Sequence, residues 1–269
     1  MLNMRLAVIG AGQMGQALIK AFAGMVMNAE DIAVYDVDEP RAASMAAELG
    51  CKKIGSSDIG SIAEYDAVLL AVKPQVISSV IKDLGAYFNK TLVMSIAAGK
   101  SIAELRSFGL TDNPLVRIMP NTPALVGSAV SGISFSDNVG ENQRHWVLKL
   151  FSSCGLAFEI NESLLDAVTG LSGSGPAYMM LVMEALADGG VRQGLSRELS
   201  LKMAAMTMLG SAKLVLETGQ HPAVLKDQVC SPGGTTIEAV AVLEERGLRS
   251  SLIEAVAASS EKARKLSGR

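Results

Sequence analysis

Up to about residue 160, short continuous apolar runs alternate with longer stretches whose apolar positions recur every three or four residues. An apolar run without polar interruptions is typical of a strand that is covered on both faces in a parallel sheet. Such runs predict strands at residues 4–9, 32–35, 67–72, 91–94 and 115–118. Because helical stretches separate these runs, the pattern predicts βαβ units and a parallel sheet.

Two of the stretches between the strands carry clear helix-start signals. Pro40 lies in the first turn of the helix predicted at 40–49, where a missing N–H is tolerated. Ser101 and Glu104 have the spacing of a capping box before the helix that follows the fourth strand. Further helices are predicted at 13–25 and in the stretch that ends near Leu84.

After Ile160 the pattern changes and predicts no strand. Helical stretches cover 163–189, 196–218, 222–229 and 235–266. The second of them carries a row of methionines, which is typical of a core or a subunit interface rather than of a cofactor site. We therefore predict an α/β fold with two domains: a Rossmann-type dinucleotide-binding domain at 1–161 and an all-helical domain at 162–269.

Composition narrows the class of protein. Lys and Arg number 24 against 27 Asp and Glu, which gives no electrostatic footprint for nucleic acid or an anionic membrane. The three cysteines and two histidines form no spacing typical of a metal site. No signal-peptide layout opens the chain, and its apolar stretches are short or interrupted by Glu184 and Asp188. A cytoplasmic protein without a membrane span or a metal is therefore expected.

The first candidate binding site is a glycine-rich loop directly after the first strand. Its pattern G-x-G-x-x-G in a βαβ unit is typical of a dinucleotide-binding turn, in which the glycines allow the tight turn, the approach of the pyrophosphate and close helix–sheet packing. Asp36, at the end of the second strand, is placed to hold the ribose 2′-hydroxyl. The residues of the loop are Gly10, Ala11, Gly12, Gln13, Met14 and Gly15.

Asp36 also bears on the choice of coenzyme. A carboxylate at this position repels a 2′-phosphate and favours NADH, whereas the nearby Arg41 favours NADPH. The sequence does not rank the two effects, and the weak expectation of NADH rests on Asp36.

Three further strand ends share small residues and prolines that would form a wall for the nicotinamide. Ligands of open parallel sheets bind outside the carboxyl ends of the strands. Either Lys73 or Asn121 offers a hydrogen bond to the nicotinamide or the substrate, although each segment taken alone is also an ordinary βα turn. The candidate residues are Ala71, Val72, Lys73 and Pro74, then Ala97, Ala98 and Gly99, and finally Asn121.

A second glycine-rich loop lies about 220 residues further along, before a helix. Thr235 is predicted as the N-cap of that helix with Glu238 as its reciprocal partner. The N–H groups of Gly233 and Gly234 lie where the helix dipole favours an anion, so the loop suits a substrate carboxylate. An ordinary capped helix after a turn is the alternative.

Together these stretches resemble the pyrroline-5-carboxylate reductase family. The most specific piece is LKDQVCSPGGTTIEA at residues 225–239. Supporting pieces are VKP at 72–74, SIAAG at 95–99, MPNTPA at 119–124 and GLSGSGPAY at 170–178. The resemblance spans residues 5 to about 266.

The resemblance implies hydride transfer from NADH or NADPH to the imine carbon of 1-pyrroline-5-carboxylate, which becomes C5 of the product L-proline. It implies that the loop Ser231, Pro232, Gly233, Gly234 and Thr235 binds the substrate carboxylate. Thr236 would lie near the ring nitrogen and is the residue closest to a catalytic acid. The family is also oligomeric, so the helical domain is expected to dimerise, alone or in a ring of dimers. Many relatives have a small polar or basic residue at the position of Asp36, which puts the family's usual NADPH preference in doubt.

Three alternatives remain at this stage. A β-hydroxyacid dehydrogenase-like reductase would need a lysine four residues after Gly175, where Met179 stands. A reductase of six-membered cyclic imino acids fits the same motifs, because the sequence does not give the volume of the substrate pocket. A non-catalytic dinucleotide sensor has no need of the second loop. Cys230, beside that loop, is interpreted as a packing thiol, with a redox-sensitive thiol as the alternative.

Overall fold

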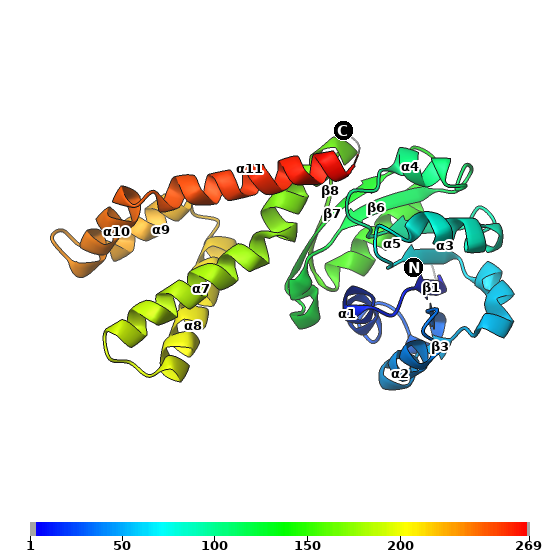
Figure 1. The fold of residues 1–269 in the computed structure, drawn as a ribbon, viewed down its shortest axis with the longest axis horizontal. Helices are drawn as coiled ribbons and strands as arrows, with labels where there is room; N and C mark the ends of the chain where they lie inside the picture. The colour runs from blue at the N-terminus through cyan, green and yellow to red at the C-terminus, as the bar shows by residue number, and fades with distance from the viewer. Residues whose placement is uncertain (1–3, 268–269) are drawn as a thin grey trace. The chain divides into compact units, whose positions relative to one another are not determined.

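One eight-stranded sheet organises the first part of the chain (Figure 1). The computed structural model describes residues 4–267. The strand order is β3-β2-β1-β4-β5-β6-β7-β8, parallel throughout except that β6 and β7 are antiparallel. The strands are β1 (Leu6–Ile9), β2 (Ile32–Tyr35), β3 (Lys52–Lys53), β4 (Ala67–Leu70), β5 (Leu92–Ser95), β6 (Leu115–Met119), β7 (Ala129–Phe135) and β8 (Gly155–Glu159).

Two hydrophobic cores cover the two faces of this sheet. Because successive strand residues point to opposite faces, Leu6 and Val8 enter one core while Ala7 and Ile9 enter the other. This explains why β1, β2 and β4, in the middle of the parallel strands, are apolar at every position. The first core is covered by α1 (Gln13–Phe22), α2 (Glu39–Leu49) and α5 (Glu141–Ser152). The second is covered by α3 (Ile77–Leu84) and α4 (Ile102–Ser107).

Within the described residues no strand follows β8, and helices joined by short loops make up this part of the chain. The helices are α6 (Leu165–Val168), α7 (Gly175–Arg192), α8 (Arg197–Thr218), α9 (Pro222–Val229), α10 (Thr235–Glu245) and α11 (Leu248–Leu266). The predicted Rossmann-type sheet followed by helices is therefore confirmed. The chain divides into two compact units, Gly175–Ala257 and the described residues on either side of it. The predicted boundary between 161 and 162 stays a prediction.

Two predicted helices are wrong in extent. The stretch 163–189 contains a separate π-helical turn, Thr169–Gly173, between α6 and α7. Two glycines in that turn weaken the regular helix. The stretch 235–266 is interrupted at Gly247, whose φ of +73° is the left-handed conformation that glycine tolerates.

Helix α8 corrects the expectation that no long apolar segment is present. It is the one helix of the described residues that is long and apolar enough to cross a membrane, with a mean hydropathy of 1.3 over its most apolar 18 residues. Only 11% of that segment is buried within the chain. In Figure 1, α7 and α8 run side by side as an antiparallel hairpin. The exposed methionines of α8, Met203 and Met206, are not core residues of this chain.

Candidate functional site

The first glycine loop joins β1 to α1, and two of its glycines are required by packing. Gly10 has φ of +113°, and a Cβ there would lie 2.5 Å from the carbonyl oxygen of Ala71. A Cβ on Gly15 would lie 2.5 Å from the carbonyl oxygen of Gly10. These contacts bring the start of α1 against the ends of β1 and β4.

Gly12 differs from the other two glycines because open space lies beside it. Apart from its own neighbours along the chain, no atom of the described residues lies within 4 Å of the position that its Cβ would take. Gly12 is also the N-cap of α1, with no side-chain cap and no acidic residue in the first turn among the described residues. The first N–H groups of α1 thus have no capping side chain, and the open space beside Gly12 forms a cradle at the kind of helix N-terminus that binds phosphate groups.

Asp36 follows β2 directly, and its carboxylate holds the glycine loop. Oδ2 accepts a 2.7 Å hydrogen bond from the backbone N–H of Ala11, and Oδ1 accepts one of 2.9 Å from the N–H of Asp38. The side chain is only 11% exposed. The predicted ribose-binding carboxylate therefore lies beside the loop and shapes it.

The other strand ends are less uniform than the sequence indicated. Strand β4 ends at Leu70, so Ala71 begins the turn and packs against Gly10. Lys73 is exposed, whereas Ala97 is buried and Ala98 is exposed. Gly99 has φ of +71° and packs against Leu266, which gives it a structural role.

Asn121 is built into the structure at the end of β6. Its amide nitrogen donates to the carbonyl oxygen of Ser172 in the π-helical turn at 3.0 Å, and its amide oxygen accepts from the N–H of Val130 at 2.9 Å. The residue is 7% exposed. Asn121 thus links β6, β7 and the π-helical turn, and its contact with a coenzyme stays a prediction.

The second glycine loop connects α9 to α10 in the unit Gly175–Ala257. The N–H of Gly234 donates to the carbonyl oxygen of Ser231 at 3.0 Å, and a Cβ on Gly234 would lie 2.2 Å from Oγ of Ser231. Gly233 has φ of +65°, so both glycines are needed for this tight turn.

The predicted cap of α10 is wrong. Gly234, in an extended conformation, is the N-cap, and Thr235 is the first residue of the helix. No side chain of the described residues caps this end. Because the first N–H groups of α10 are left without a capping side chain, the loop suits a carboxylate better than the predicted capping box would. Thr236 follows in the same turn and is partly exposed.

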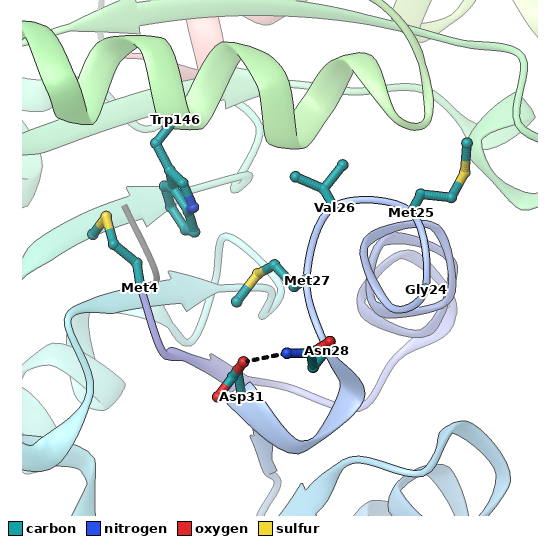
Figure 2. Close-up of a pocket in the computed structure, with 8 residues that line it drawn as sticks. All are labelled: Met4, Gly24, Met25, Val26, Met27, Asn28, Asp31 and Trp146. Atoms are coloured by element: carbon teal, nitrogen blue, oxygen red, sulfur yellow. Dashed lines mark hydrogen bonds between the residues drawn. The ribbon is translucent and has the colours of Figure 1, made fainter. Parts of the chain in front are cut away.

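A separate cavity of about 290 Å³ lies beside the segments that precede β1 and β2 (Figure 2). It is lined by residues before β1 and β2 and by Trp146 of α5. Asp31, its one carboxylate, accepts a hydrogen bond from Asn28 at 3.2 Å. None of the predicted site residues lines it. Within residues 4–267 no group of His, Cys, Asp or Glu could hold a metal ion.

The fold and the first loop together are those of a dinucleotide-binding protein. Two structures share this fold at low identity, a semialdehyde dehydrogenase NAD-binding protein from Cupriavidus necator (18% identity, TM-score 0.62) and a ketol-acid reductoisomerase from an uncultured archaeon (15%, TM-score 0.65). They cover 98% of this chain, and it covers 100% and 85% of theirs. Residues 5–99 match the family model of coenzyme F420-dependent NADP oxidoreductases.

More specific relatives identify the family. Residues 162–266 match the model for pyrroline-5-carboxylate reductase dimerisation. The chain is 44% identical to the pyrroline-5-carboxylate reductase of Methanosarcina acetivorans and 41% identical to that of Escherichia coli, in each case over 98% of both chains. The crystal structure of the Plasmodium falciparum enzyme with NADP bound has a TM-score of 0.89 at 33% identity and 99% coverage of both chains. The chain belongs to the pyrroline-5-carboxylate reductase family and is an NAD(P)H-dependent oxidoreductase.

Proposed function

We propose that this chain reduces 1-pyrroline-5-carboxylate to L-proline, the last step of proline biosynthesis. The observation that carries the proposal is the uncapped N-terminus of α10 behind the Ser231–Gly234 turn, in a chain whose family relatives are named for this reaction. The substrate carries one carboxylate, which is the group that such a helix N-terminus binds.

Each loop has a separate task in this proposal. The cradle beside Gly12 and the free N–H groups of α1 bind the pyrophosphate of the coenzyme. The bound reduced nicotinamide supplies the hydride that the imine carbon accepts. The turn Ser231–Gly234 and Thr235 hold the substrate carboxylate, which orients the ring.

Thr236 is the proposed catalytic residue. A protonated cyclic imine already accepts a hydride well, so a hydroxyl that stabilises the proton on the ring nitrogen is sufficient. The Thr236 side chain is partly exposed in the first turn of α10, next to the residues assigned to the carboxylate.

We propose that a second copy of the chain packs against the apolar surface of the unit Gly175–Ala257. Met180 and Leu181 of α7 and Met206 and Leu216 of α8 are between 60% and 70% exposed. A surface of this kind is unusual on a monomer in water, and it lies in the segment that matches the dimerisation model. The proposal is a cytoplasmic homodimer, alone or in a ring of dimers, rather than a membrane-spanning helix. Sedimentation of the purified chain without detergent tests it, and a monomer or a detergent requirement contradicts it.

Comparison of two acceptors tests the substrate. We expect kcat/KM for 1-pyrroline-5-carboxylate to exceed that for the six-membered imine 1-piperideine-6-carboxylate at least tenfold. The reverse order would assign the chain to six-membered imino acids. Binding of the coenzyme without turnover of either acceptor would indicate the sensor.

A further inference from the structure

The side chain that is best suited to bind a 2′-phosphate is already engaged by a carboxylate. Nη2 of Arg41 lies 2.7 Å from Oδ2 of Asp38, and the backbone N–H of Arg41 donates to Oδ1 of the same side chain at 3.1 Å. Asp38 is the N-cap of α2. One carboxylate therefore both starts the helix and holds the arginine.

A second carboxylate faces the same arginine. Oδ2 of Asp36 lies 4.0 Å from Nη1 of Arg41, and Asp36 is largely buried against the glycine loop. Arg41 is thus flanked by Asp36 and Asp38. Its guanidinium offsets part of the charge of these carboxylates and would have to leave Asp38 in order to bind a phosphate in the bidentate geometry that arginine prefers.

The next cation along this edge is also engaged. Nζ of Lys53, at the end of β3, lies 2.8 Å from Oε2 of Glu39, and Oγ of Ser56 donates to Oε1 of Glu39 at 2.6 Å. The hydrogen bonds from Lys53 and then from Ser56 lower the pKa of Glu39 to about 2. Three carboxylates therefore face two cations around the end of β2, which disfavours a dianionic phosphate.

We propose that Asp38 is a specificity-determining residue, which selects NADH over NADPH by holding Arg41 away from the 2′-position of the coenzyme. This proposal rests on the coenzyme site of the proposed function. In it Asp36 binds the loop and the ribose hydroxyls, while Asp38 withholds the guanidinium that a 2′-phosphate needs. NADH has a hydroxyl at that position and does not need the arginine.

The test is calorimetric titration of NAD⁺ and NADP⁺ into the intact protein, without imine substrate. Asp38→Asn keeps an N-cap for α2 but removes the charge that holds Arg41, and Asp38→Ser is a second variant of the same kind. We expect the wild-type protein to bind NAD⁺ at least tenfold more tightly than NADP⁺. Asp38→Asn should strengthen NADP⁺ binding about tenfold and change NAD⁺ binding less than twofold. Adding Arg41→Ala to that variant should abolish the gain.

The outcomes separate this proposal from the proposed function. Tighter wild-type binding of NADP⁺, an unchanged ratio in both Asp38 variants, or a gain that survives Arg41→Ala would each overturn the role of Asp38. None of these three results contradicts the proposed reductase reaction, because the titrations measure coenzyme binding without an acceptor. A wild-type protein that binds neither dinucleotide would contradict both proposals together.

Discussion

The backbone N–H of Ala11 donates a 2.7 Å hydrogen bond to the carboxylate of Asp36, so the first glycine loop is tied to the end of β2. The adjacent N–H of Gly10 donates to the carbonyl oxygen of Tyr35, also at 2.7 Å. These two hydrogen bonds fix the loop in the shape that leaves open space beside Gly12. Asp36 therefore acts on every dinucleotide, whatever its 2′-group.

Asp36→Ala is expected to weaken binding of both coenzymes. The variant removes the acceptor of the Ala11 N–H, and the loop loses its link to β2. NAD⁺ should lose about tenfold in affinity, and NADP⁺ less, because repulsion of the 2′-phosphate is relieved. The ratio thus shifts towards NADP⁺ without a gain in NADP⁺ affinity. Calorimetry measures the affinities for NAD⁺ and NADP⁺. Unchanged NAD⁺ affinity would show that Asp36 neither holds the loop for coenzyme binding nor binds the ribose.

The glycines of the first loop give a matched pair of variants. Gly12→Ala places a methyl group in open space, so the protein should unfold at the wild-type Tm but bind NAD⁺ at least tenfold less tightly. Gly15→Ala places its methyl group against the Gly10 carbonyl oxygen, so its Tm should fall. Differential scanning calorimetry and coenzyme titration separate the two effects. If Gly12→Ala binds NAD⁺ as tightly as the wild-type protein does, the pyrophosphate does not bind in the cradle beside Gly12.

Thr236→Ala is expected to lower kcat with little change in coenzyme affinity. The lost hydroxyl is assigned to the ring nitrogen of the substrate, and a single donor of this kind contributes roughly 10²-fold to kcat. Thr236→Ser keeps the hydroxyl and should retain most of the rate. If the serine and alanine variants turn over equally, or if alanine matches the wild type, Thr236 has no part in the reaction.

Asn121→Ala should destabilise the sheet unit. It removes partners from the partly buried N–H of Val130 and the carbonyl oxygen of Ser172, which costs about 2 kcal/mol in the free energy of unfolding. Urea denaturation measures the loss. Ser56→Ala, on the exposed surface, is a control that should change stability far less. A change below about 0.5 kcal/mol for Asn121→Ala would contradict the linking role.

The strands of the parallel sheet were predictable because both of their faces are covered. A doubly covered strand is largely apolar; β1, β2 and β4 have that pattern throughout, and β5 and β6 have it except at Ser95 and Arg117. The pattern missed the remaining three strands. β3 has two exposed lysines, β7 contains serines and a glycine within its run, and β8 is partly exposed. Polar residues and glycine remove the continuous apolar signal from β3 and β7, whereas β8 (GLAFE) is not fully buried at any position.

The candidate site was predictable where backbone geometry demands glycine. Gly10 and Gly15 are required by close contacts that only glycine permits, and such positions leave a pattern in the sequence. Side-chain partners leave no such pattern. The wrong cap at Thr235 and the link from Asn121 to Ser172 both depend on which hydrogen bonds the folded chain forms. The engagement of Arg41 by Asp38 was missed for the same reason.

The most direct test of the account is reduction of 1-pyrroline-5-carboxylate by the purified protein with NADH deuterated at the transferring position of C4. We predict rapid oxidation of the coenzyme with an equal amount of L-proline formed, carrying one deuterium at C5. The product is identified by mass spectrometry and NMR. Coenzyme oxidation without labelled proline, or no oxidation with either NADH or NADPH, would contradict the proposed function.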